Sequence, residues 1–79
     1  MPSYNPPNAF YSQLSIPTYV HPMALMGPNG FHFKNITHLT GCDYLWYDGY
    51  RGVVEIWSKN RHNLPKAKEM LIRHINLMY

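Results

Sequence analysis

Two glycines three positions apart, Gly27 and Gly30, restrict the possible folds of this chain more than any other feature. The apolar residues 23–26 before them make barely one helical turn. Residues 29–40 after them repeat apolar side chains at helical spacing, and Asn29 is a suitable N-cap for that helix. Gly41 stands where a left-handed helix end favours glycine. The sequence therefore predicts two consecutive helices joined by a tight glycine turn.

Strands are predicted on both sides of this helical pair. Residues 14–20 alternate as a short strand, and Pro17 restricts that strand to a sheet edge or a bulge. Two aromatic and β-branched runs surround Asp48 and Gly49, which is typical of a β-hairpin with a short loop. Residues 1–13, with prolines at positions 2, 6 and 7, predict an irregular or disordered lead-in.

The last segment is the clearest helix of the chain. Asn63 can cap it, and Pro65 suits its first turn. Glu69 and Arg73 stand at the spacing of a favourable ion pair. One apolar stripe consists of Leu64, Ala67, Met70, Leu71, Ile75 and Met78. The predicted class is therefore α+β, with one sheet and one helical layer.

Composition excludes several classes of protein. A chain of 79 residues holds one small domain, and 46% hydrophobic residues exclude a wholly disordered chain. The single cysteine, Cys42, excludes an internal disulfide and a multi-cysteine zinc site. Because no signal peptide is visible, we expect a reducing compartment, cytoplasmic or nuclear, and no secretion. No apolar run approaches the roughly 20 residues that span a bilayer, so no membrane partner is expected.

Charge is unevenly distributed along the chain. The formal net charge is +3, no charged side chain precedes Lys34, and five of the seven basic residues lie at or after Lys59. The excess of positive charge weakly favours a polyanionic partner. It is equally compatible with lysines that only keep a small domain in solution.

The pattern of these residues resembles a KH (K-homology) domain of type I from about Leu14 to Met78. The resemblance implies an α+β fold of the order β-α-α-β-β-α, with a three-stranded antiparallel sheet packed against three helices. It covers residues 14–79 as a single KH domain. The positions that carry it are Leu25, Met26, Gly27, Gly30, Phe33, Lys34, Ile36, Thr40, Gly41, Cys42 in the small alanine position, Tyr44, Trp46, the run VVEIW and the run LPKAKEMLIRHI.

The resemblance implies a groove for about four nucleotides of single-stranded RNA, or else single-stranded DNA, and neither an enzyme nor a cofactor. Its physical basis is sound, since glycines let a phosphate backbone approach closely and a helix N-terminus favours phosphate. The residues that it assigns to nucleic-acid binding are Met23, Ala24, Leu25, Gly27, Pro28, Asn29, Gly30, Phe31, Phe33, Lys34, Thr37, Tyr44, Trp46 and Arg51.

One departure from the family pattern supports an alternative function. The middle of the turn usually includes Lys or Arg, but here it is Pro28 and Asn29. A degenerate KH fold that serves as a protein-interaction or dimerisation module is therefore the second hypothesis. A four-nucleotide site is weak by itself, so a homodimer or a neighbouring domain is also expected.

Other reactive residue types indicate no further chemistry. The five histidines match no common zinc framework, and no metal is expected. A nucleophilic Cys42 would need a base and an orienting group, and packing in the core is the simpler interpretation. No carboxylate pair, catalytic triad or phosphate loop with a lysine is present, so catalysis is not predicted.

Overall fold

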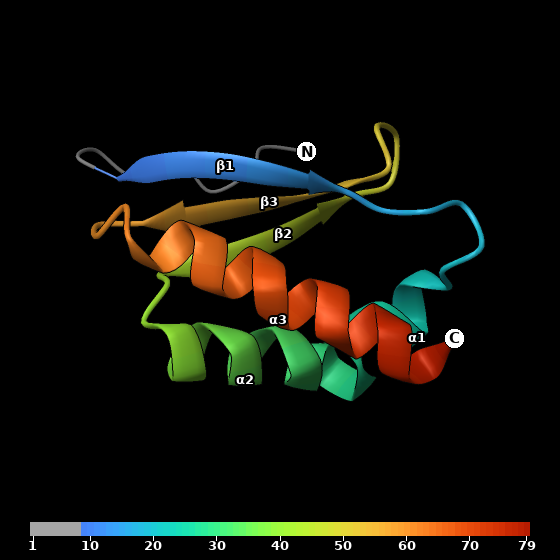
Figure 1. Ribbon diagram of the computed structural model, residues 1–79. Helices are drawn as coiled ribbons and strands as arrows, with labels where there is room; N and C mark the ends of the chain where they lie inside the picture. Colours follow the sequence, from blue (N-terminus) through green and yellow to red (C-terminus); the bar gives the residue numbers. More distant parts are fainter. Residues whose placement is uncertain (1–8) are drawn as a thin grey trace.

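The computed structural model describes residues 9–79, and it has the predicted α+β class with one antiparallel three-stranded sheet (Figure 1). Residues 1–8, which belong to the expected lead-in, lie outside this part. The elements are β1 (Phe10–Ser15), α1 (Pro22–Met26), the 3₁₀ turn η1 (Pro28–Gly30), α2 (Phe31–Thr40), β2 (Tyr44–Asp48), β3 (Val53–Ser58) and α3 (Asn63–Met78).

The sheet has the order β1-β3-β2, so β3 is central and the other two strands form the edges. The first strand starts at Phe10 rather than Leu14, and it ends at Ser15. Pro17 explains this shift, because its carbonyl accepts the N–H of Val20 in a turn that leads the chain away from the sheet. The predicted hairpin is confirmed, with β2 and β3 paired from Asp48 and Val53 onward.

Two helices, α2 and α3, pack on one face of the sheet and on each other. This differs from the expected layer of three helices. The segment α1 has five residues between His21 and Gly27, and it packs mainly on α2 at one end of the molecule. The predicted apolar stripe of α3 is confirmed: its members Leu64, Ala67, Leu71 and Ile75 are buried. No helix within residues 9–79 is long and apolar enough to cross a membrane.

The helix ends are partly as predicted. Gly41 has the expected left-handed conformation, with φ 75°, and ends α2. Asn29 is not an N-cap, because it is itself left-handed (φ 54°) and Gly30 occupies the cap position. Asn63 is the first residue of α3 rather than its cap, and its side-chain amide donates to the carbonyl of Gly41. This bond joins the end of α2 to the start of α3.

Candidate nucleic-acid interface

The turn between α1 and α2 is held in a conformation that favours glycine. Gly27, Asn29 and Gly30 all have positive φ, of 78°, 54° and 72°. Gly27 also has ψ 169°, a combination that is essentially restricted to glycine. The N–H of Gly30 donates to the carbonyl of Gly27 at 3.1 Å and closes the turn.

The two glycines have different surroundings. A Cβ at Gly27 would stand 2.5 Å from Cδ2 of His32, so this side of the turn is filled. A Cβ at Gly30 would meet no atom within 4 Å. The turn therefore presents an open side at Gly30, where another molecule can approach the backbone closely.

Gly30 also marks the start of α2, which is ten residues long. No side chain caps this end, and the first turn has no acidic residue. Its N–H groups therefore lack a side-chain acceptor, and the helix dipole gives them a partial positive charge. Lys34, one turn further, is the only Lys or Arg of α2. A phosphate at this helix end would meet favourable charge only.

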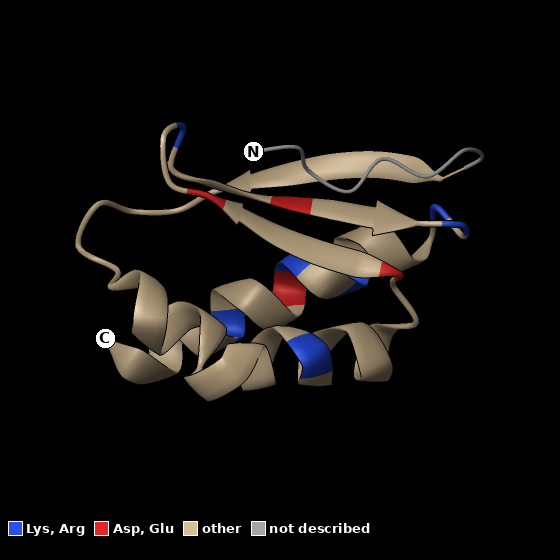
Figure 2. Cartoon of the chain, turned by 180° about the vertical axis from the view of Figure 1, so that it is seen from behind, with Lys and Arg blue, Asp and Glu red and all other residues tan. Residues whose placement is uncertain are grey.

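A groove of about 350 Å³ starts at this turn and runs between α2 and β2. Met26, Gly30, Phe33 and Lys34 form one wall, and residues 44–47 of β2 form the other. A further hollow of about 210 Å³ continues past Phe33 and Lys34 to Thr37 and Asp43. Figure 2 shows the molecule from the side opposite Figure 1, with β2 above α2. We call the two connected hollows the α2–β2 groove.

The wall made by β2 combines apolar side chains with backbone polar groups. Because β2 is an edge strand of the sheet formed within residues 9–79, part of its N–H and C=O groups point away from β3. Leu45 is buried, and Tyr47 packs against the core. Tyr44 and Trp46 lie on the opposite face, as alternation predicts, with ring centroids 6.4 Å apart. Such a wall can accept a flat base and hydrogen-bond its edge.

Six of the predicted binding residues line the α2–β2 groove: Gly30, Phe33, Lys34, Thr37, Tyr44 and Trp46. Gly27, Pro28 and Asn29 form the turn beside it. The groove also includes Met26, Asp43, Leu45 and Tyr47, which sequence reasoning did not assign. Alternation along residues 44–48 could have identified Leu45 and Tyr47, because they point to the same side as the core.

Four other predicted binding residues do not line the groove. Leu25 has no exposed surface and belongs to the core, so its assignment to the groove wall is corrected. Met23 and Phe31 are 62% and 59% exposed, and neither they nor the exposed Ala24 form part of either hollow. Because α1 packs with Leu25 inward, its neighbours Met23 and Ala24 face outward, while Phe31 is exposed at the start of α2.

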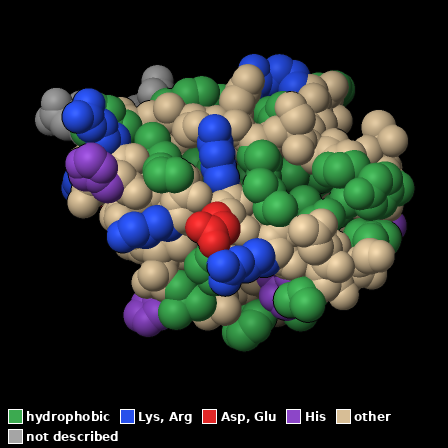
Figure 3. Space-filling model, viewed as in Figure 1, with side chains coloured by type: hydrophobic (Ala, Val, Ile, Leu, Met, Phe, Trp, Pro, Cys, Tyr) green, Lys and Arg blue, Asp and Glu red, His purple; other side chains and the backbone are tan. Residues whose placement is uncertain are grey.

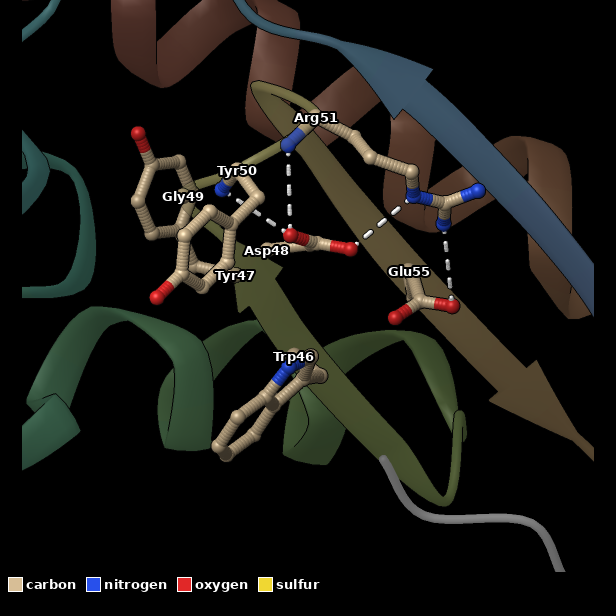
Figure 4. A pocket seen from close by; sticks show the side chains of 7 residues that line it. All are labelled: Trp46, Tyr47, Asp48, Gly49, Tyr50, Arg51 and Glu55. Carbon is tan, nitrogen blue, oxygen red and sulfur yellow. Dashed lines mark hydrogen bonds and ion pairs between the residues drawn. The ribbon is translucent and has the colours of Figure 1, made fainter. Parts of the chain in front are cut away.

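Arg51 lies in the loop between β2 and β3, where two carboxylates bind it (Figure 4). Its Nε is 2.9 Å from Oδ2 of Asp48, and its guanidinium is also 3.3 Å from Oε2 of Glu55. The hydrogen bond from Arg51 holds the pKa of Asp48 below its usual range. The positive charge of Arg51 is therefore balanced within the protein, and this side chain offers little attraction to a phosphate.

Among residues 9–79, no three His, Cys, Asp or Glu side chains are gathered as a metal site. Cys42 is buried, as expected for a packing residue, and its thiol lies 3.2 Å from the carbonyl oxygen of Asn63. Burial raises the pKa of the Cys42 thiol, so the thiolate needed for nucleophilic chemistry is disfavoured.

No family model, curated protein or solved structure matches the chain.

Proposed function

We propose that this protein is a type I KH domain, of the order β-α-α-β-β-α, that binds about four nucleotides of single-stranded RNA in the α2–β2 groove. The observation that supports this most is the position of the groove. It extends from an open glycine turn at a helix N-terminus to the outer edge of β2. A single strand needs the first surface for its phosphates and the second for the edges of its bases, and the two must lie side by side.

The phosphate side of this proposal rests on Gly30 and Lys34. Gly30 has open space around its α-carbon and stands at the uncapped start of α2. Lys34 lines both parts of the groove, so its ammonium can reach a phosphate that passes the turn. The turn itself contributes backbone N–H groups in place of the usual cationic side chain.

The base side rests on Phe33, Leu45 and the edge of β2. Phe33 and Leu45 line both parts of the groove and give it an apolar floor. Unstacked bases can lie on such a floor while their edges bond to backbone groups on the outer edge of β2. A duplex cannot present its bases in this way, so the proposed ligand is single-stranded.

A protein-interaction module is the second candidate, and one specific observation favours it. Apolar side chains gather on the α3 face toward the C terminus (Figure 3). Tyr19, Leu77 and Tyr79 are exposed large hydrophobic residues, at 64%, 87% and 59%. Tyr19 and Tyr79 contact each other edge to face, with ring centroids 5.3 Å apart. A second protein chain could cover this surface while leaving the groove open.

Substitution of Gly30 tests the nucleic-acid proposal. Gly30→Asp places a carboxylate where the phosphate is expected, and Gly30→Asn is a matched neutral control of the same shape. Both side chains enter open space, and both residues tolerate left-handed backbone better than most. We expect both variants to stay folded by circular dichroism. Gly30→Asp should lose at least about tenfold more affinity for random single-stranded RNA than Gly30→Asn, roughly 1.4 kcal/mol.

Titrations of single strands, the matching duplexes and DNA strands complete this test. Amide NMR signals of residues 27–36 should move when single-stranded RNA is added. Equal affinities of the Asp and Asn variants would show that no phosphate passes this turn. Tighter binding of the duplex would also contradict the proposal. Absence of any binding, together with self-association lost on Leu77→Asp, would favour the protein-interaction module.

A further inference from the structure

A second hollow, of about 420 Å³, lies at the loop between β2 and β3. We call it the loop pocket. Its volume is within the range of about 300–1,000 Å³ that small-molecule sites occupy. Trp46 and Tyr47 line both the loop pocket and the α2–β2 groove, so the two hollows adjoin. The remaining lining residues are Asp48, Gly49, Tyr50, Arg51 and Glu55 (Figure 4).

Aromatic rings form one side of the loop pocket. Figure 4 shows the rings of Tyr47 and Tyr50 on the side away from Glu55, with the indole of Trp46 below them. Tyr50 is fully exposed, so within residues 9–79 its ring is not used for packing. Exposed aromatic rings of this kind are platforms on which planar groups stack.

Carboxylates form the other side, and one of them retains a free oxygen. Both oxygens of Asp48 accept bonds from the loop, from the N–H groups of Tyr50 and Arg51 and from the Arg51 side chain. In Glu55, Oε2 accepts from the Tyr11 hydroxyl at 2.7 Å and pairs with Arg51. Oε1 of Glu55 has no protein partner within residues 9–79, and it lies on the side of Trp46 (Figure 4).

The free oxygen of Glu55 indicates what the loop pocket can bind. The Glu55 side chain is only 10% exposed, and since no buried side-chain oxygen within residues 9–79 lacks a partner, Oε1 reaches the surface of the loop pocket, where it can accept a hydrogen bond from an N–H donor. The two carboxylates and Arg51 give the lining a formal charge of −1, which disfavours a phosphate. A planar group with an N–H donor fits both the rings and the carboxylate.

We propose that the loop pocket binds one further nucleobase, adjacent to the strand in the groove, with its exocyclic amino group donating to Glu55. This inference rests on the proposed function. The shared residues Trp46 and Tyr47 favour it over a cationic side chain from a protein partner, because a strand that leaves the groove passes directly into the pocket. Adenine, cytosine and guanine carry the amino group, and uracil does not.

The test compares random four-nucleotide RNAs with five-nucleotide RNAs whose extra unit, at either end, is A, C, G, U or an abasic sugar. When the extra unit stands at one of the two ends of the RNA, a base with an exocyclic amino group should raise the affinity at least fivefold over the abasic unit. Its effect on affinity should also be larger than that of uracil. Tyr50→Ala should remove most of this gain and leave four-nucleotide binding unchanged, while Tyr50→Phe should retain it. Glu55→Gln should reduce the preference over uracil.

The outcomes separate this inference from the proposed function. If four-nucleotide RNAs bind and the fifth base adds nothing, the loop pocket is not a base site, although the groove remains one. If no RNA binds, both proposals fail. A peptide containing trimethyl-lysine that shifts the NMR signals of Trp46 and Tyr50 without RNA would assign the pocket to a protein ligand and overturn the inference. Circular dichroism of each variant verifies its fold.

Discussion

The imidazole of His32 lies against the α-carbon of Gly27, so close that a Cβ there would come within 2.5 Å of the ring carbon Cδ2. The same turn leaves the α-carbon of Gly30 open. Both positions have a backbone conformation that favours glycine, but only at Gly27 does the packing of the protein itself also exclude a side chain.

Alanine substitutions should separate these two requirements. Gly30→Ala introduces left-handed strain alone, which costs about 1–2 kcal/mol. Gly27→Ala adds the contact with His32 and a backbone region that only glycine populates, so its loss of unfolding free energy should be larger by about 1–3 kcal/mol. Urea denaturation measures both. His32→Ala in the Gly27→Ala background should recover part of the loss, and equal losses for the two glycines would contradict this account.

Leu25 and Met23 give a second prediction, because both lie on α1 and only Leu25 is buried. Leu25→Ala should lower the free energy of unfolding by about 2–5 kcal/mol through the cavity it leaves. Met23→Ala should change it by no more than about 0.5 kcal/mol. Thermal denaturation of the pair checks this difference. If Leu25→Ala left the stability unchanged and lowered the affinity for RNA, Leu25 would be a binding residue and its assignment to the core would be wrong.

The lowered pKa of Asp48 leads to a prediction of how the free energy of unfolding depends on pH. Its pKa is lowered in the folded protein by the hydrogen bond from Arg51, so the unfolded chain binds the proton more readily. The resulting stability is present above the unfolded carboxyl pKa of about 4, and it is lost as the pH falls through the lower folded pKa. Asp48→Asn should therefore flatten the decrease in unfolding free energy below about pH 4.

Arg51→Gln provides the matched control for that prediction, since it removes the donor and leaves the carboxylate. It should flatten the same part of the pH profile, and the double variant should show no further flattening. If the profile of Asp48→Asn matches the unmodified protein, Arg51 does not set the pKa of Asp48.

Pro28 is the best position at which to restore a cation to the turn. Asn29 has φ 54°, a conformation that lysine adopts only with strain, so Pro28→Lys is preferable to a change at Asn29. Pro28→Lys should raise RNA affinity and increase the slope of log affinity against log salt by about 0.7. Pro28→Gln should leave the slope unchanged. An unaltered slope in Pro28→Lys would indicate that phosphates do not reach the turn.

Local patterns predicted those parts of the fold that depend on neighbours in the sequence. The apolar stripe of residues 64–78 and the alternation in residues 44–48 identified α3 and β2, because a helix and a strand each repeat their buried positions regularly. Gly41 was identified as a helix end for a similarly local reason. Pro17 was expected inside an edge strand; β1 is an edge strand, but it ends at Ser15, before this proline.

Features that depend on distant contacts could not be predicted. Asn63 resembles a helix cap in sequence, yet its side chain donates to Gly41, 22 residues away. Arg51 resembles a free cation, but the hairpin brings Glu55 within 3.3 Å of it and Asp48 within 2.9 Å. The inward orientation of Leu25 likewise depends on how α1 packs against α2. Only the folded chain brings these partners together.

The carboxylates at the two ends of the α2–β2 groove set a limit on the ligand. Asp43 stands at the far end, and Asp48 and Glu55 stand in the adjoining loop pocket, while Lys34 lies between them. A polyanion lying along this path gains attraction in the middle and meets repulsion where it leaves at either side. The charges would thus restrict the proposed RNA to the α2–β2 groove and the one base in the loop pocket, because phosphates beyond them would gain no electrostatic attraction.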